Sequence, residues 1–470
     1  MQAAQTILSS NVHDQSSEKK ILDNVTSSPS TIISAAPSRG GSLTSLYSCE
    51  QSTEKFLAMP VVSATCSALD SGPPTYFRSR KMKKEQIAKP WLKEKKDRYQ
   101  IWQTIIPLLG VVLGLGFGAF MVYDGWTSVP VHEYCVVYDD DFSSGRLNSD
   151  IWTKEVEVGG FGNGEFEETT VTDENVFVKN GILTIQPTLQ DEKLLTTNNI
   201  LNLTKMGICT SDEWNHCVAS TNVTNGTIIP PTRSARINTK KGVQIKYGRV
   251  EVVAKMSTGD WLWPAIWMLP ADNRYGAWPL SGEIDIAESI GNNYTYPSGG
   301  NNIISSTLHW GPDSSNDAWW QTFGKTNALH STFQNDFHTF GLEWSEKYIY
   351  MYLNTRLLQV MYNQFGTPFW QRGKFPLSGA NGTSFVDPWT QTANPATPFD
   401  QSFYLILNVA VGGTNGWFQD GVAGKPWVDA SPTARKDFWN ARDKWYSTWT
   451  DPTMQIKSVK MWQQKGYNGC

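Results

Sequence analysis

A run of 23 residues without a charged side chain, IWQTIIPLLGVVLGLGFGAFMVY (101–123), divides the chain. A helix of this length rises about 35 Å, enough to cross a hydrocarbon layer of about 30 Å. The run has no polar face, which argues against a helix packed on the core of a soluble domain. We therefore expect a transmembrane helix over residues 101–123.

The residues before this run predict the orientation of the helix. Residues 1–77 are rich in Ser, Thr and Ala without periodicity, so we expect a disordered tail. Residues 78–100 are dense in Lys and Arg, and such basic flanks stay in the cytosol. The run also begins too far along the chain for a cleaved signal peptide. These patterns predict a signal-anchor, a single-pass type II protein whose residues 124–470 are lumenal or extracellular.

Two features of residues 124–470 are typical of the secretory pathway. Five Asn-x-Ser/Thr glycosylation motifs occur there, at Asn202, Asn222, Asn225, Asn293 and Asn381. The segment also contains an even number of cysteines, Cys135, Cys209, Cys217 and Cys470. We favour a local Cys209–Cys217 bridge, with Cys135 and Cys470 joining the ends of the domain. Four cysteines allow three pairings, and the sequence does not decide among them.

Short alternating or apolar runs separated by Gly, Asn, Asp and Pro fill residues 138–470; GILTIQP, YGRVEVVAKM, YIYMYLN and FYLILNVAVGG are examples. Many short strands with few helical stretches predict an all-β sandwich of antiparallel sheets. One helical stretch is expected late in the chain, at 431–449, with Pro432 near its start. A net charge of −4 gives no global basic patch, which argues against nucleic acid as a partner.

The segment PLSGEIDIAES (279–289) carries three acids, Glu283, Asp285 and Glu288, separated by apolar residues. On a regular strand the first two share one face and Glu288 points to the other, where an unpaired charge would be costly. A β-bulge at Ile286–Ala287 would restore the phase and bring all three acids to one face. We therefore predict a bulged strand here.

Three carboxylates on one face have a chemical use. A retaining glycosidase needs one carboxylate that attacks the anomeric carbon and one carboxylic acid that donates a proton. We assign Glu283 as the nucleophile, Glu288 as the acid/base and Asp285 as the residue that orients Glu283. Crowding of like charges keeps one acid protonated beside an ionised neighbour. The alternative is a solvated or calcium-binding acidic strand, but the Ile spacers demand burial of the other face.

GEIDIAE, together with WPAIWMLP, resembles glycoside hydrolase family 16, in its laminarinase-like branch with a bulged Glu-x-Asp-x-x-Glu strand. The likeness runs from DDDFSSGRLNSDIW through SARINTKKGVQIKYGRVEVVAKM to IKSVKMWQ, which is nearly all of residues 124–470. The resemblance implies a concanavalin A-like β-jelly-roll sandwich with a cleft on its concave face. It implies retaining endo-cleavage of β-1,3 or mixed β-1,3/1,4 glucan, without an organic cofactor. Some members bind structural calcium, although no ligand loop for it is recognisable here.

The same resemblance points to substrate-binding positions around the acids. Alternation in WLWPAIWML places Trp263, Ala265 and Trp267 on one face, and Trp267 matches the residue that stacks on the sugar at the cleavage point. Trp261 and Trp263 either extend the aromatic wall that Trp267 begins or pack at its rim. His309 is either a histidine that lines the cleft or a structural histidine. Asn163 and Glu165, in a Gly-rich turn, are the remaining candidates.

Three functions remain open on the sequence. The first is an endo-1,3(4)-β-glucanase-like hydrolase; the second is a transglycosylase, since both use one glycosyl-enzyme intermediate. The single-pass architecture resembles fungal cell-wall proteins of β-1,6-glucan assembly, which favours wall remodelling at the membrane. The third is a non-catalytic β-glucan recognition protein, which keeps the fold but usually lacks the acids. A galactan- or xyloglucan-specific relative is disfavoured, because Ala287 makes the strand of the bulged type.

Overall fold

The computed structural model describes residues 80–93, 95, 97–128, 131–379 and 382–470, so the expected tail over 1–77 lies outside the described residues. The described residues fall into two units, one that ends at Ile101 and one that runs from Trp102 to Cys470. The basic segment contains two short 3-10 turns, η1 (Lys84–Gln86) and η2 (Pro90–Leu92). Among the described residues, α1 (Arg98–Ser128) is the one helix that is long and apolar enough to cross a membrane.

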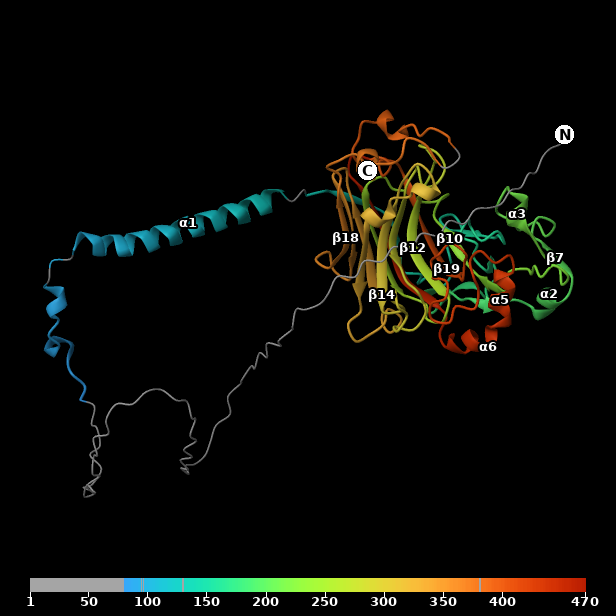
Figure 1. Ribbon diagram of the computed structural model, residues 1–470, viewed down its shortest axis with the longest axis horizontal. Coiled ribbons are helices and arrows are strands. Elements are labelled where there is room, and N and C mark those ends of the chain that lie inside the picture. The colour runs from blue at the N-terminus through green and yellow to red at the C-terminus, as the bar shows by residue number, and fades with distance from the viewer. Residues whose placement is uncertain (1–79, 94, 96, 129–130, 380–381) are drawn as a thin grey trace, which may run out of the picture. The chain divides into compact units, whose positions relative to one another are not determined.

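Two antiparallel sheets make up most of the second unit (Figure 1). The eight-stranded sheet has the order β18 (Gln359–Gln364), β17 (Tyr348–Leu353), β16 (His338–Trp344), β11 (Gly248–Lys255), β20 (Met454–Gln464), β5 (Ile182–Ile185) and β4 (Val176–Lys179), and β1 (Tyr134–Asp140) pairs with β20. The seven-stranded sheet has the order β15 (Phe323–Asn327), β14 (Ile303–His309), β13 (Glu283–Glu288), β12 (Leu262–Pro270), β19 (Phe403–Val411), β10 (Arg236–Asn238) and β2 (Thr153–Glu155). The prediction of an all-β sandwich of antiparallel sheets is confirmed.

The main core contains apolar side chains from strands of both sheets. Ile266 and Ile284 of the seven-stranded sheet and Val250 and Ile456 of the eight-stranded sheet are all 0% exposed. Because side chains alternate along a strand, the residues between them point to the opposite face of each sheet. That opposite face of the seven-stranded sheet carries the polar residues described below.

The smaller elements gather at one side of the strands (Figure 1). They include α2 (Glu192–Thr196), β7 (Asn199–Asn202), α3 (Trp214–Cys217), β8 (Val218–Thr221), α5 (Ala434–Asn440) and α6 (Arg442–Trp445), beside a small sheet of β3 (Glu167–Thr169), β9 (Thr232–Ser234) and β6 (Thr188–Leu189). The helix predicted at 431–449 is present as α5 and α6, interrupted at Ala441, followed by η6 (Tyr446–Thr448). The other short elements are η3 (Ser314–Asn316), η4 (Trp319–Gln321), α4 (Phe369–Gly373) and η5 (Pro388–Gln391).

Both favoured disulfides are present, Cys135–Cys470 and Cys209–Cys217. The first spans 335 residues and ties β1 to the end of the chain, whereas the second closes a local loop of the small elements. Of the predicted glycosylation motifs, Asn222, Asn225 and Asn293 are exposed and Asn202 is half-buried, while Asn381 lies outside the described residues.

Candidate active site

The strand β13 contains the predicted bulge. Asp285 pairs with Trp267 of β12 and Glu288 pairs with Ala265, so three steps along β13 match two along β12. The same irregularity appears against β14. The extra residue returns Glu288 to the face of Glu283 and Asp285, as the phase argument predicted.

Burial and mutual repulsion set the protonation of these acids. Asp285 is 2% exposed and Glu288 is 7% exposed, while Glu283 is half-buried. Burial and the neighbouring Asp285 carboxylate raise the pKa of Glu283 from 4.5 to about 8. The same two causes raise the pKa of Glu288 well above its ordinary value. Near neutral pH the cluster therefore retains protons, which is the state that general acid catalysis requires.

Two indole groups donate hydrogen bonds to the outer acids. Trp278 Nε1 donates to Glu283 Oε2 at 3.0 Å, and Trp263 Nε1 donates to Glu288 Oε1 at 2.9 Å. Trp417 stacks on Trp263 with the ring centroids 4.5 Å apart. Sequence reasoning missed Trp278 and Trp417. Trp278 could have been considered because it lies five residues before Glu283 in the sequence. The local sequence around Trp417 gives no indication that it lies near the acids.

His309, at the end of β14, lies among the acids. Its Nε2 is 3.2 Å from Asp285 Oδ2 and 3.9 Å from Glu283 Oε1, and its Nδ1 is 2.5 Å from Asp317 Oδ2. Burial lowers the pKa of His309, but the hydrogen bonds with Asp285 and Asp317 outweigh burial and raise this pKa well above 6.5. The imidazole is thus held as a cation between carboxylates.

Glu283, Asp285 and His309 also offer atoms within 4.8 Å of one another, a spacing that a metal ion could use. A metal needs a deprotonated imidazole nitrogen as its ligand. Since the contacts of His309 favour the imidazolium, the three residues fit a hydrogen-bonded acid cluster better than a metal centre.

Trp267 of β12 packs with Arg236 and Phe161. Trp267 shares the face of Asp285, and its Nε1 donates to Asn408 Oδ1 at 2.7 Å. The Arg236 guanidinium lies 4.7 Å from the centroid of the Trp267 ring and 4.1 Å from that of Phe161. These contacts hold Trp267 on the same side of the sheet as the acids, where sequence reasoning had expected it.

Asn163 and Glu165 are brought together by the Gly-rich turn. Asn163 Nδ2 donates to Glu165 Oε1 at 2.9 Å, and Asn415 Nδ2 donates to Asn163 Oδ1 at 3.1 Å. The turn needs glycine, because Gly162 and Gly164 have φ of 84° and 65°. Glu165 is 3% exposed. Burial lowers the pKa of Arg236, but the carboxylates of Glu155 and Glu165 outweigh burial and raise it. Glu165 in the turn therefore interacts electrostatically with Arg236, the residue that lies over the Trp267 ring.

The expectation that Trp261 extends the sugar-facing wall needs correction. Trp261 is 2% exposed and packs edge-to-face on Trp427 and Phe418, with centroids 5.2 Å and 5.5 Å away. Trp261 precedes β12 and has φ of 69°, so the alternation of β12 does not continue back to it. Its side chain consequently points into the aromatic core.

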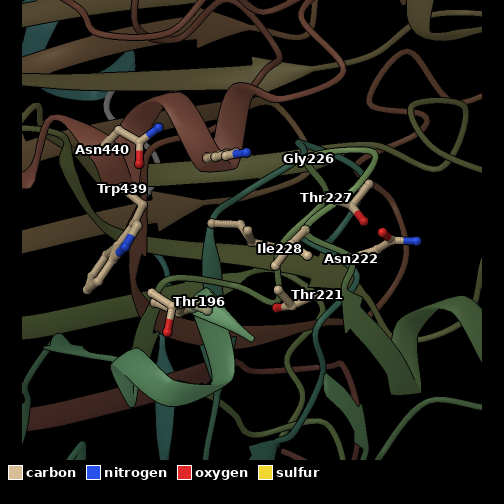
Figure 2. A pocket seen from close by; sticks show the side chains of 11 residues that line it. Thr196, Thr221, Asn222, Gly226, Thr227, Ile228, Trp439 and Asn440 are labelled. Carbon is tan, nitrogen blue, oxygen red and sulfur yellow. The ribbon is translucent and has the colours of Figure 1, made fainter. Parts of the chain in front are cut away.

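A separate cavity of about 210 Å³ lies between α2, β8 and α5 (Figure 2). It is lined by Leu195, Thr196, Thr221, Asn222, Val223, Gly226, Thr227, Ile228, Lys436, Trp439 and Asn440. This lining contains no carboxylate, so it lacks the pair of carboxyl groups that a retaining glycosidase needs. The acid cluster on β13 is therefore the candidate active site.

Comparisons with known proteins identify the family of this chain. Residues 172–393 match Glycosyl hydrolases family 16. The chain is 40% identical over 347 residues to a β-1,3-glucan-binding protein of Penaeus monodon, covering 70% of this chain and 91% of that protein. The chain belongs to glycosyl hydrolases family 16.

Two other relatives match over a smaller part of their length. The glucan endo-1,3-β-glucosidase A1 of Niallia circulans is 30% identical over 293 residues, 59% of this chain and 34% of that enzyme. The β-1,3-glucan-binding protein 1 of Manduca sexta is 30% identical over 322 residues, 67% of this chain and 62% of that protein. This chain thus spans most of the first relative and less than two thirds of the other two.

Proposed function

We propose that this protein is a membrane-anchored, retaining glycosidase that cleaves internal β-1,3 or mixed β-1,3/1,4 bonds of β-glucan. The observation that carries the proposal is the bulge in β13, which sets Glu283, Asp285 and Glu288 on one face. Membership of family 16 supports the same chemistry. The names of the relatives, a glucan endo-1,3-β-glucosidase and β-1,3-glucan-binding proteins, support β-1,3-glucan as the ligand.

The reaction takes two displacements. In the first, a Glu283 carboxylate oxygen attacks the anomeric carbon while Glu288 gives its proton to the departing glycosidic oxygen. In the second, Glu288 takes a proton from an incoming hydroxyl, which replaces Glu283 at the anomeric carbon. The configuration is retained because it inverts twice. No organic cofactor takes part.

The neighbours of the two carboxyls suit these roles. Trp263 Nε1 donates to Glu288 Oε1, so the proton to be transferred resides on Glu288 Oε2. Trp278 Nε1 holds Glu283 Oε2 and leaves Oε1 available for attack. Asp285, paired with His309, is assigned to orient Glu283; burial and Asp285 raise the pKa of Glu283, and the His309 imidazolium acts in the opposite direction and favours the ionised nucleophile.

The incoming hydroxyl decides between hydrolysis and transfer. Water gives a hydrolase, whereas a sugar hydroxyl gives a transglycosylase that builds glucan, and both use the same covalent intermediate. Wall remodelling suits either outcome.

A second candidate function is β-glucan recognition without turnover. The names of the Penaeus monodon and Manduca sexta relatives favour it. Against it stands the complete acid cluster, in which the pKa of both Glu283 and Glu288 is raised by burial. A pure binding protein gains nothing from crowding three carboxyl groups, two of them buried, on one face of a strand.

The location of the protein belongs to the same proposal. The length and composition of α1 and the basic residues before it support a single-pass type II anchor, with the catalytic domain lumenal or at the cell surface. The two disulfides fit an oxidising compartment.

The test uses the full chain in detergent with β-1,3-, mixed-linkage and β-1,6-gluco-oligosaccharides, with products followed by mass spectrometry. Shorter products alone indicate a hydrolase, and products longer than the substrate indicate a transglycosylase. Binding of β-1,3-glucan with no product from any substrate would overturn the catalytic proposal in favour of recognition. The double variant E283Q/E288Q is the matched control for adventitious activity.

A further inference from the structure

The face that carries the acids continues to the edge strand β15. Across β13, β14 and β15, Asp285 pairs with Thr307, and Thr307 pairs with Phe323. Directly opposed residues of antiparallel strands project to the same face, so Phe323 lies on the side of the acids. Two strand spacings, about 10 Å, separate Phe323 from Asp285 along this row.

Phe323 belongs to an exposed aromatic pair. Trp319, in η4 just before β15, packs edge-to-face on Phe323 with the centroids 5.4 Å apart. Trp319 is 41% exposed and Phe323 is 37% exposed. Lys325 Nζ lies 5.3 Å from the centroid of Phe323. Large aromatic side chains left half-open on one surface are typical of a binding site.

The pair is fixed to the acid cluster by a carboxylate. Asp317 Oδ2 accepts from His309 Nδ1, and Asp317 Oδ1 accepts from the backbone N–H of Trp319 at 3.2 Å. On its other side, η4 is held by Arg372, whose Nη2 donates to the carbonyl of Gln321 at 3.2 Å. Asp317 and Arg372 thus fix the position of the aromatic pair relative to His309, so a ligand does not have to order these side chains when it binds.

We propose that Trp319 and Phe323 form an aromatic platform that binds a glucose residue of a β-glucan chain at a distance from the cleavage point. The apolar face of a pyranose ring suits an aromatic surface, and a chain lying across the strands from the acids toward β15 reaches the pair. The platform makes the protein prefer long chains over short ones. This inference rests on the proposed glucan binding and adds to it the length of the chain that is recognised.

The test measures binding, with turnover removed. Full-length E283Q is titrated with a β-1,3-linked gluco-trisaccharide and hexasaccharide by calorimetry, and the quantity compared is the ratio of the two affinities. In W319A and F323A, made separately on E283Q, we expect this ratio to fall about fivefold, as the loss of one ring contact implies. F323Y keeps the ring and should keep the ratio.

Tyr362 provides the matched control, since it is an aromatic residue, 52% exposed, on the edge strand β18 of the other sheet. Y362A on E283Q should leave the ratio unchanged. A ratio unchanged in both W319A and F323A would overturn the platform while leaving glucan binding in place. Failure of E283Q itself to bind any glucan would overturn the proposed function and the platform with it. Two independent positions keep the test valid if one variant does not fold.

Discussion

The outer faces of the two sheets both bury acids, but they treat the charge differently. On the eight-stranded sheet, Glu251 accepts from Arg249 at 2.6 Å and from Tyr352 at 2.7 Å. Glu343, which is 2% exposed, forms an ion pair with Arg356 and accepts from Tyr348 at 2.8 Å. The half-buried Glu251 and the buried Glu343 each have their own guanidinium.

On the seven-stranded sheet the acids outnumber their partners. Within the described part of the chain, His309 is the one cation in ion-pair contact with Glu283 and Asp285, and it is shared with Asp317. A buried charge without its own counter-ion lowers stability and shifts the pKa values of its neighbours. The contrast indicates that acids with their own counter-ion, as on the eight-stranded sheet, have a structural role, whereas acids without one, as on the seven-stranded sheet, have a functional role.

The largest expected effect separates the two faces by activity. E283Q should lower turnover of β-1,3-gluco-oligosaccharides by about 10³-fold or more, because an amide does not attack the anomeric carbon. Initial rates on the full chain measure it. E343Q is the control on the other sheet and should keep the rate per folded molecule. Equal losses in the two variants would mean that Glu283 acts only through the fold.

The second effect separates the faces by stability. E343Q removes the buried carboxylate that Arg356 and Tyr348 contact; because the Arg356 side chain is 53% exposed, its guanidinium stays solvated, and the loss should be about 1–3 kcal/mol. E283Q, in contrast, replaces a carboxyl whose raised pKa keeps it largely protonated at neutral pH with a neutral amide, so it should cost less. Denaturant unfolding monitored by tryptophan fluorescence gives both free energies of unfolding. A larger loss in E283Q than in E343Q would refute the contrast.

The third effect is the pH dependence of stability. The pKa of Glu283 is about 8 in the fold, against an ordinary value of 4.5, so between these pH values the native state binds more protons than the unfolded state. Its contribution to the free energy of unfolding is complete below pH 4.5 and is lost as pH rises, by up to about 1.4 kcal/mol per pH unit. Unfolding of the wild-type chain and E283Q across this range should show a shallower fall in E283Q. Parallel curves would contradict the raised pKa.

Much of the sandwich and the centre of the site follow from local sequence. Alternation predicts the strands, and the phase of three acids against apolar spacers predicts the bulge, because only a shift by one residue keeps Ile284 in the core with Glu288 on the acid face. Alternation failed at Trp261, since it holds only within a strand and Trp261 lies before β12 in a left-handed backbone conformation.

The second layer of the site could not be predicted. Trp417 reaches Trp263 across 154 residues of chain, and Arg236 meets Trp267 through strands that are adjacent only after the sheet has formed around β19. Such contacts arise from loop closure and sheet order, which no local period encodes. Asp317 is nearer to His309 in sequence, but an acid in an irregular loop gives no sign of its partner.

The smallest expected effect concerns how His309 tunes the acids. Its imidazolium lowers the pKa of both Glu283 and Glu288. In H309N the two pKa values rise, so the acidic limb of the pH–activity profile, set by ionisation of the nucleophile, and the alkaline limb, set by deprotonation of the acid, both move to higher pH. H330N is the control, since His330 is exposed with φ of 58°, a conformation that Asn tolerates. A profile that loses height in H309N without moving along the pH axis would show that His309 positions Asp285 and does not act by its charge. The contrast between acids with and without their own counter-ion would then rest on the carboxylates alone.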